Sequence, residues 1–60
     1  MTRKLLTPSQ VSEITGIAEG TLAQWRYKKI GPPWYKLGRH CRYDEAELLM
    51  WIQENAQEAA

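Results

Sequence analysis

Hydrophobic residues in the first part of the chain recur at helical spacing. Val11 and Ile14 lie three residues apart, which places them on one face of a helix. The segment Thr7-Pro8-Ser9-Gln10 before them has the form of a capping box, with a proline suited to the first helical position. Gly16 can adopt the left-handed conformation that ends a helix. The pattern therefore predicts a helix over residues 8–15.

A second helical pattern begins immediately after this stop. Apolar side chains follow at helical spacing: Ile17, Ala18, Leu22 and Trp25. They predict a helix over residues 18–28 with a weak start, because Ala18 stands where a serine would cap the helix. The opposite face carries small and polar side chains, with Ala23 at its edge: Gly20, Thr21, Gln24, Tyr27 and Lys28. Gly31-Pro32-Pro33 is expected to stop the helix and form a stiff connector.

Residues 34–37 and 40–43 are two short β-type runs around Gly38-Arg39, which predicts a β-hairpin. Alternation along the two runs predicts two different faces. One face is expected to hold Tyr35, Leu37, Cys41 and Tyr43. The other is expected to hold Lys36, His40 and Arg42.

A third helix is predicted from Asp44 to about residue 55. Asp44-Glu45-Ala46-Glu47 is a capping pattern, with acidic groups where the helix dipole favours them. The apolar stripe of this helix is expected to be Leu48, Leu49, Trp51 and Ile52, with Met50 facing outward. The tail from Gln57 onward is expected to fray. Together the elements form a single domain over residues 1–60 with a core in residues 5–55, mainly α with a small β-hairpin.

The size and composition of the chain argue against several kinds of protein. Sixty residues leave little room for a substrate pocket beside a core, so we expect no enzyme and no cofactor. No apolar run reaches the ~18 residues that span a membrane, and Pro8 interrupts the basic N-terminus too early for a signal peptide. Cys41, the single cysteine, fits a reducing, cytoplasmic setting. His40 beside it would point to the opposite strand face, so no metal site is expected.

The charges are divided unevenly along the chain. Residues 1–43 contain all eight Lys and Arg residues and two acidic residues, whereas residues 44–60 contain five acidic residues and no Lys or Arg. This division suggests a polyanionic partner for the basic part. The alternative is an ordinary solvated surface on which the charges pair internally.

The order of the predicted elements is that of a winged helix-turn-helix. In this layout the second helix enters the DNA major groove, and the basic hairpin is the wing. On the helix, small residues allow close approach and polar ones can contact bases or phosphates: Gly20, Thr21, Ala23, Gln24, Tyr27 and Lys28. On the wing, the candidates for backbone or minor-groove contact are Lys36, Arg39, His40 and Arg42.

An ordered set of segments resembles the small winged helix-turn-helix domains of the MerR-like superfamily, and most closely its excisionase (recombination directionality factor) and AlpA-type branch. The resemblance covers about four fifths of the chain. It rests on Leu6-Thr7-Pro8, Thr15-Gly16-Ile17, Gly20 to Arg26, Gly31-Pro32-Pro33, Lys36 to Tyr43 and Asp44 to Trp51. The compact length is similar to that of actinobacterial (mycobacterial) phage excisionases.

The resemblance implies a function without catalysis. Excisionases bind tandem sites in phage attachment DNA, often cooperatively, bend it and direct an integrase towards excision. Two departures bear on the site. His40 and Cys41 stand where relatives often have a basic and an aliphatic residue, and Glu19 lies beside the recognition face, where it would repel phosphate. The same fold also fits a small AlpA-type transcriptional regulator, and a third hypothesis is a protein-interaction adaptor with a Trp-rich surface.

Several residues have more than one interpretation. Trp25 is expected in the core because it shares a face with Leu22, and Trp34 and Trp51 are expected in the core or at its edge. Arg26 is expected either to pair with an acidic residue of the last helix or to contact DNA. The acidic last helix is either a solvated face or one side of a head-to-tail contact with the basic wing of a neighbouring copy.

Overall fold

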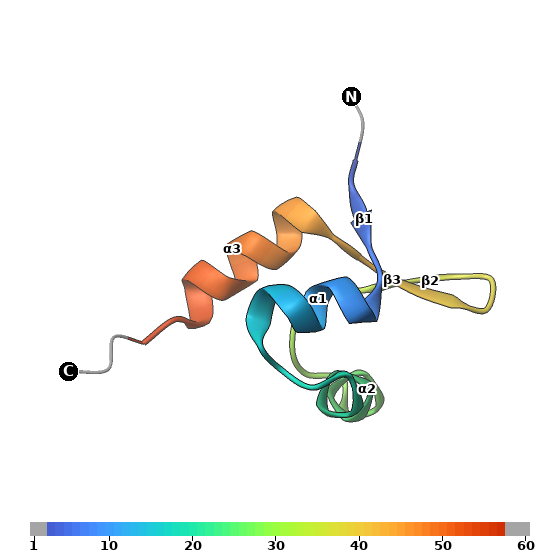
Figure 1. Cartoon of the computed structure of the whole chain (residues 1–60), viewed down its shortest axis with the longest axis horizontal. Helices are drawn as coiled ribbons and strands as arrows, with labels where there is room; N and C mark the ends of the chain where they lie inside the picture. The colour runs from blue at the N-terminus through green and yellow to red at the C-terminus, as the bar shows by residue number, and fades with distance from the viewer. Residues whose placement is uncertain (1–2, 58–60) are drawn as a thin grey trace.

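The computed structural model of the chain describes residues 3–57 and contains three helices and three short strands (Figure 1). In chain order the elements are β1 (Leu5–Leu6), α1 (Pro8–Thr15), α2 (Glu19–Lys28), β2 (Tyr35–Leu37), β3 (His40–Asp44) and α3 (Glu45–Asn55). The strands form one antiparallel sheet in the order β1-β3-β2. The β2–β3 hairpin projects from the helical body as a wing (Figure 1). The fold is a winged helix-turn-helix, as the sequence predicts.

The helix α1 begins and ends where the sequence predicts. The Thr7 side chain accepts a hydrogen bond from the backbone N–H of Gln10, and the Gln10 side chain accepts one from the backbone N–H of Thr7. Gly16 ends the helix at φ 74°, and its N–H donates to the carbonyl of Ser12. The capping box and the left-handed glycine thus define a helix of eight residues.

The helix α2 ends before the glycine-proline segment is reached. Lys29 takes the left-handed conformation at φ 60°, and the Ile30 N–H donates to the carbonyl of Trp25 at 2.9 Å. Gly31 therefore does not end the helix, but a glycine is still required there, because its φ is 87° and a Cβ would lie 2.7 Å from Cε3 of Trp25. At the other end, Ala18 provides no side-chain cap, as expected.

The register of the hairpin corrects the predicted assignment of faces. The two-residue turn pairs Leu37 with His40, Lys36 with Cys41 and Tyr35 with Arg42. Because directly paired residues of antiparallel strands point to the same side, Tyr35 and Leu37 share a face with His40 and Arg42. Lys36 shares the other face with Cys41 and Tyr43. The sequence-based assignment was wrong because it carried the alternation straight across the turn, whereas a two-residue turn puts its flanking residues, Leu37 and His40, on the same face.

The strand β1 is an element that the hydrophobic pattern does not predict. Leu5 pairs with Asp44 and Leu6 pairs with Tyr43, so this short segment joins the inner strand of the wing. Two consecutive leucines carry no alternation from which a strand could be inferred. The pairing puts Leu6 in the core, where 2% of its surface is exposed.

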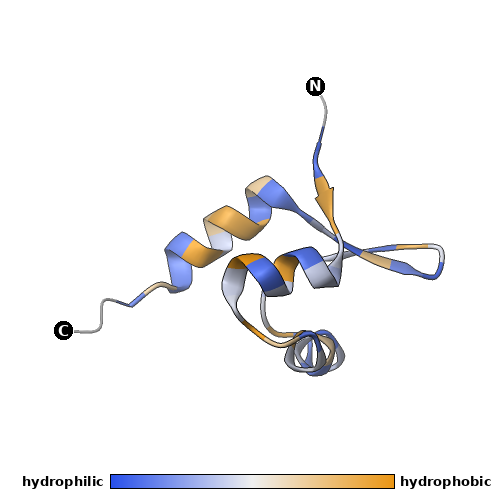
Figure 2. Cartoon of the chain, in the orientation of Figure 1, coloured by the Kyte–Doolittle hydropathy of each residue, from blue (hydrophilic) through white to orange (hydrophobic). Residues whose placement is uncertain are grey.

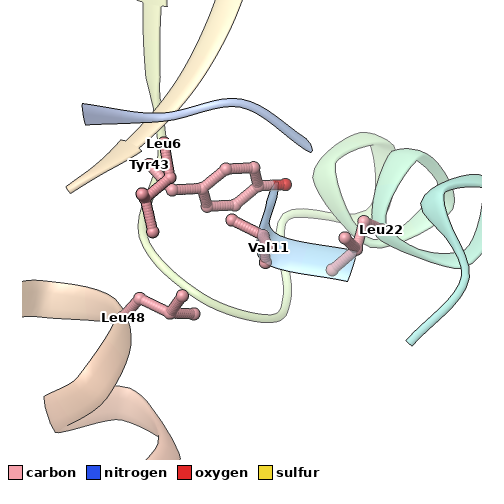
Figure 3. Packing of buried hydrophobic residues seen from close by; sticks show 5 residues of the cluster. All are labelled: Leu6, Val11, Leu22, Tyr43 and Leu48. Carbon is pink, nitrogen blue, oxygen red and sulfur yellow. The ribbon is translucent and has the colours of Figure 1, made fainter. Parts of the chain in front are cut away.

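The core lies where α1, α2 and α3 meet the inner face of the sheet. Its fully buried members are Leu6, Val11, Leu22, Tyr43 and Leu48 (Figure 3). Further apolar side chains pack partly buried around them: Ile17, Trp25, Cys41, Trp51 and Ile52. Trp25 and Trp51 are in contact, with ring centroids 6.1 Å apart. Trp25, expected in the core, packs partly buried against it, and Trp51 does the same. Trp34 lies at the edge with 37% of its surface exposed, so the position expected for Trp34 and Trp51, in the core or at its edge, is confirmed.

Two predicted core residues are exposed instead. Ile14 is 47% exposed, because it lies at the end of α1 beside a shallow apolar hollow bounded by α3. Leu49 is 50% exposed, because the buried stripe of α3 follows Leu48, Trp51 and Ile52 at intervals of three and four residues. Met50 faces outward as predicted.

Hydrophobic residues gather on β1 and α3, whereas hydrophilic residues occupy β3 near the tip of the wing (Figure 2). Among residues 3–57, no helix combines the length and the hydrophobicity needed to cross a membrane. The fraying expected for the C-terminal tail concerns mainly residues 58–60, which lie outside the described part of the chain.

Candidate nucleic-acid interface

The outward face of α2 is an exposed surface of small and polar side chains. Leu22 is fully buried and Trp25 half-buried, so they anchor the inner face of the helix. The six residues expected to contact a ligand are placed on the opposite side: Gly20, Ala23, Gln24, Tyr27 and Lys28 are exposed, and Thr21 is half-buried. Four of them line one shallow hollow, namely Ala23, Gln24, Tyr27 and Lys28. The structure therefore brings this part of the predicted site together.

The chemistry of this face suits the edges of nucleic-acid bases. The Gln24 side chain has both a donor and an acceptor, so it can form a bidentate pair with a base. Tyr27, with 89% of its surface exposed, offers an aromatic ring and a hydroxyl to any ligand that covers the helix. Gly20 has no atom within 4 Å of the place where a Cβ would stand, so its surface is open to close approach.

The turn between α1 and α2 fixes the orientation of α2, and with it the outward face of this helix, relative to α1. The Thr15 hydroxyl donates to the carbonyl of Val11 at 2.8 Å and accepts from the N–H of Ile17 at 3.2 Å. Gly16 between them supplies the left-handed step. One side chain thus ties the end of α1 to the residue that leads into α2, which makes the turn a defined structure.

The predicted wing residues do not share one face. Lys36, Arg39 and His40 are exposed near the tip, where Gly38 makes the turn with φ 62°. From the register, Lys36 is on the face that carries Tyr43, and His40 is on the opposite face. The polar side chains of the wing therefore surround its tip on both sides. This arrangement suits contact with a phosphate backbone better than contact with a flat surface.

Arg42 is placed differently from the other three wing candidates. It is half-buried, and its Nη1 donates to the carbonyl of Cys41 at 2.7 Å. It lies across from Tyr35 near the base of the hairpin. Of the four wing candidates, Arg42 therefore has the side chain that is least available to a ligand at the tip.

Ion pairs in the described part of the chain use two of the eight cations. Arg3 pairs with Asp44 at 3.0 Å and lies 3.6 Å from Glu47, and Lys4 lies 3.5 Å from Glu45. The Glu47 backbone N–H and the Arg3 guanidinium both hold the pKa of Asp44 below its usual value. Among residues 3–57, no ion pair involves the other six cations: Arg26, Lys28, Lys29, Lys36, Arg39 and Arg42. All six belong to α2, its C-cap or the wing.

The partner of Arg26 is a residue that the sequence did not suggest. Its Nη1 donates to the hydroxyl of the buried Tyr43 at 2.7 Å, and its guanidinium lies 5.8 Å from the ring of Trp34. Within residues 3–57 it pairs with no acidic side chain of α3. Burial is the main cause that raises the pKa of Tyr43. A buried tyrosine hydroxyl usually needs a hydrogen-bond partner, so an expectation of burial for Tyr43 would have been the sequence signal for a contact of this kind.

Two further features of the surface bear on the chemistry of the site. Glu19 stands in the first turn of α2, where the helix dipole favours a negative charge. In the part of the chain that the structure describes, no three His, Cys, Asp or Glu side chains gather closely enough to hold a metal ion.

Residues 5–56 match the family described as a helix-turn-helix domain, and the matched span runs from β1 through both helices of the motif and the wing to the end of α3. No curated protein matches the chain.

Proposed function

This chain belongs to the helix-turn-helix domain family, and from that premise we propose that it is an excisionase-type architectural protein. Sequence-specific binding of double-stranded DNA is the activity that the domain supports. The finer proposal is that the protein binds tandem sites in phage attachment DNA, bends the DNA and directs an integrase from integration towards excision. It would act in the cytoplasm of the bacterial host and would itself catalyse no step.

The observation that carries the DNA-binding function is the position of the six unpaired cations. In the described part of the chain, only Arg3 and Lys4 form ion pairs, and their acidic partners lie at the start of α3. The other six cations lie on α2, its C-cap and the wing, the elements that carry the candidate residues. A basic surface that also carries hydrogen-bonding side chains has the composition of a DNA interface, in which phosphate contacts position the protein and base contacts specify the site.

The dimensions of the fold allow both contacts at once. An α-helix with its side chains is about 10–12 Å across and fits the major groove, which is about 12 Å wide. With α2 in the groove, Gln24 and Thr21 can reach base edges, and Gly20 and Ala23 permit close approach. The wing, projecting from the same body, then meets the neighbouring backbone with Arg39 and the side chains beside it (Figure 1).

Binding to tandem sites would be assisted by contact between neighbouring copies. The acidic side of a head-to-tail contact would involve Glu54, which is exposed on α3. Glu45 and Glu47 are less available, since each already lies near a cation of its own chain. The basic side would be the wing of the next copy.

Nuclease footprinting on genomic fragments that the protein retains at moderate salt tests the proposal. Evenly spaced sites in the same orientation, with hypersensitive bands between them, are the expected result for an excisionase that bends its DNA. A single or inverted site over a promoter would favour an AlpA-type regulator with the same interface. No protection at any salt would contradict DNA binding and favour an adaptor that binds another protein.

A further inference from the structure

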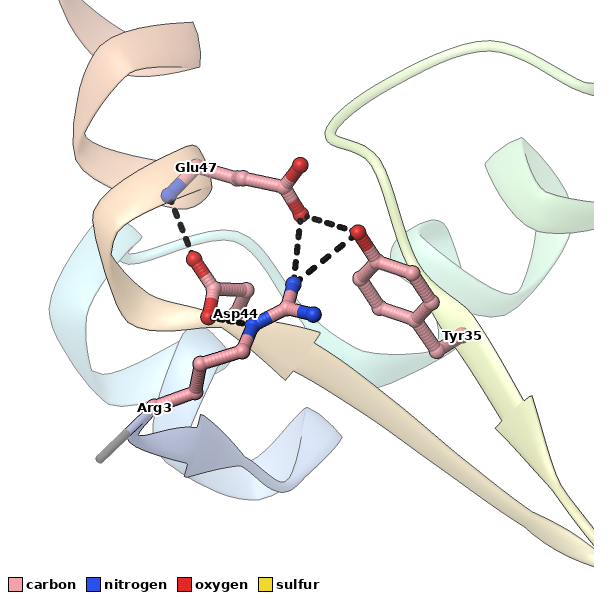
Figure 4. Close-up of polar contacts among 4 residues, drawn as sticks. All are labelled: Arg3, Tyr35, Asp44 and Glu47. Carbon is pink, nitrogen blue, oxygen red and sulfur yellow. Dashed lines mark hydrogen bonds and ion pairs between the residues drawn. The ribbon is translucent and has the colours of Figure 1, made fainter. Parts of the chain in front are cut away.

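A polar cluster on the outer face of the sheet joins the N-terminal segment, the wing and α3 (Figure 4). The Arg3 guanidinium donates from Nε to Oδ1 of Asp44 at 3.0 Å and from Nη2 to the hydroxyl of Tyr35 at 3.0 Å. That hydroxyl donates to Oε1 of Glu47 at 2.7 Å, and Arg3 Nη2 lies 3.6 Å from the same oxygen. The contacts therefore link three segments that are far apart in the sequence.

Tyr35 is the member of the cluster that belongs to the wing. It begins β2, which lies at the edge of the sheet and, among residues 3–57, pairs with β3 alone. On the inner face, the base of the wing is held by Tyr43, which is buried and bonded to Arg26. On the outer face, the base of the wing is held by the hydroxyl of Tyr35, which bonds to Arg3 and Glu47. A hairpin held on both faces cannot rotate about β3 without breaking one of the two attachments.

We propose that this cluster positions the wing on DNA, with Tyr35 and Arg3 as positioning residues that themselves touch no DNA. The inference rests on the proposed function, because it assumes that the tip of the wing meets the DNA backbone. It assigns a role in binding to two side chains that lie outside both α2 and the tip.

Leverage explains why a contact at the base would matter at the tip. Arg39 is four residues beyond Tyr35, which corresponds to about 13 Å of extended strand. At that length, a rotation of about 20° at the base moves the tip by about 4–5 Å. A displacement of this size exceeds the reach of a direct ion pair, for which nitrogen and oxygen lie within about 4 Å.

The side of the cluster at the start of α3 is buried and capped. Asp44 is 5% exposed, and its Oδ2 accepts from the backbone N–H of Glu47 at 3.0 Å as the cap of α3. It therefore holds Arg3 against a rigid helix end. The guanidinium of Arg3 also lies 5.0 Å from the centre of the Tyr35 ring, so ring and hydroxyl are held together.

A double-mutant cycle on DNA binding tests the inference. The probe is a fluorescently labelled 30-base-pair duplex of mixed sequence, since contacts between the tip and phosphate do not depend on sequence. We expect Arg39→Ala to weaken binding by about fivefold in the wild-type chain and by less than about twofold in the Tyr35→Phe background. Tyr35→Phe alone is expected to weaken binding by about fivefold, and Arg3→Gln to behave in the same way.

Lys4→Gln is the matched control. It removes the neighbouring ion pair to Glu45 from the same N-terminal segment and leaves the wing untouched. In this background Arg39→Ala should keep its full, approximately fivefold effect. Additive losses for Tyr35→Phe and Arg39→Ala, or wild-type binding by Tyr35→Phe, would overturn the inference.

A measurement without DNA separates this inference from the proposed function. In ¹⁵N relaxation, the order parameters of the Gly38 and Arg39 amides should fall from about 0.85 to below about 0.6 in Tyr35→Phe and stay unchanged in Lys4→Gln. Unchanged values in Tyr35→Phe would mean that the cluster does not hold the wing. If the wild-type chain fails to bind the duplex at any salt, the proposed function fails, and the order parameters still decide whether the cluster restrains the hairpin.

Discussion

The side chains proposed to contact DNA differ in chemistry between α2 and the wing. Gln24 combines a donor and an acceptor on an exposed helix face, which suits a base edge. Arg39 is an exposed charge at a turn, which suits a phosphate. Because the first contact depends on the base pair and the second does not, substitutions of the two residues should differ in kind and not only in size.

Replacing Gln24 should reduce discrimination between DNA sequences. We expect Gln24→Ala to lose about 1–3 kcal/mol of binding free energy on a footprinted site and much less on random DNA, if the amide pairs with a base. Titrations of both duplexes by fluorescence anisotropy measure the difference. Gln53→Ala, which alters an exposed glutamine of α3 away from the interface, is the control and should leave both affinities unchanged. Equal losses on the two duplexes would exclude Gln24 from base recognition.

Replacing Arg39 should change the dependence of binding on salt. Arg39→Ala is expected to reduce the slope of log K against log salt concentration by about one unit, because one phosphate contact and its released counterion are lost. Arg39→Lys keeps the charge and should keep the slope. Titrations at several salt concentrations on specific and random duplexes provide the test. A slope that Arg39→Ala leaves unchanged would remove this residue from the contacts.

At the scale of elements, the sequence predicts helix boundaries well and the pairing of strands poorly. Thr7 and Gly16 act on their own local backbone, so the start and the end of α1 can be inferred from them. The faces of the wing depend on how the turn pairs the two strands, because a two-residue turn at Gly38-Arg39 puts the residues that flank it on one face. The prediction instead carried the odd–even alternation straight across the turn, which reversed one strand. This error also hid the cluster around Tyr35, whose members come from three distant segments.

The exposure of the candidate residues on α2 was predictable for the same local reason. Once Leu22 and Trp25 are assigned to the core, helical geometry alone places Gln24 and Tyr27 on the outside. The contact between Arg26 and Tyr43 could not be derived in this way. It depends on how α2 packs against β3, and neither residue's neighbours in the sequence contain that information.

Two glycines of the α2 region should respond to alanine in opposite ways. Gly20→Ala is expected to stabilise the protein by about 0.5 kcal/mol, since helical alanine is favoured and the site has open space. Gly31→Ala should destabilise it by about 2–4 kcal/mol, because the methyl group meets the Trp25 ring and φ is 87°. Urea unfolding measures both changes.

The Gly20 substitution also tests the placement of α2 on DNA. If the backbone at this position approaches the groove closely, Gly20→Ala should weaken DNA binding while it increases the free energy of unfolding. If Gly20→Ala increases the free energy of unfolding but leaves the affinity for DNA unchanged, the start of α2 stays clear of the DNA.

At the scale of the whole molecule, charge pairing uses other cations than those proposed for DNA binding. Arg3 and Lys4 bind the start of α3, and the cations of α2 and the wing stay free of ion pairs within residues 3–57. The described acidic residues of α3 and its N-cap therefore form no ion pair with the candidate interface. At the start of α3, they instead join the N-terminal segment to this helix. The small net charge of +1 conceals this separation of roles.

Acid should weaken the connection between the N-terminal segment and the start of α3. The pKa of Asp44 is lowered in the folded protein, first by the Glu47 N–H and then by Arg3. The ionised carboxylate therefore stabilises the fold above the usual aspartate pKa of about 3.9. That stabilisation should be lost as the pH falls through the lower pKa of the folded state, since protonation weakens both the cap of α3 and the bond to Arg3.

The free energy of unfolding in urea between pH 2 and pH 6 tests this expectation. The wild-type chain should lose stability at the acid end of this range, whereas Asp44→Asn should be less stable at pH 6 and show a shallower decline. Glu54→Gln is the control, because it alters an exposed carboxylate of α3 for which no ion pair is seen within residues 3–57, and it should keep the wild-type profile. An equally steep acid decline in Asp44→Asn would show that other carboxylates control the acid stability of the fold, and that the connection through Arg3 contributes little to it.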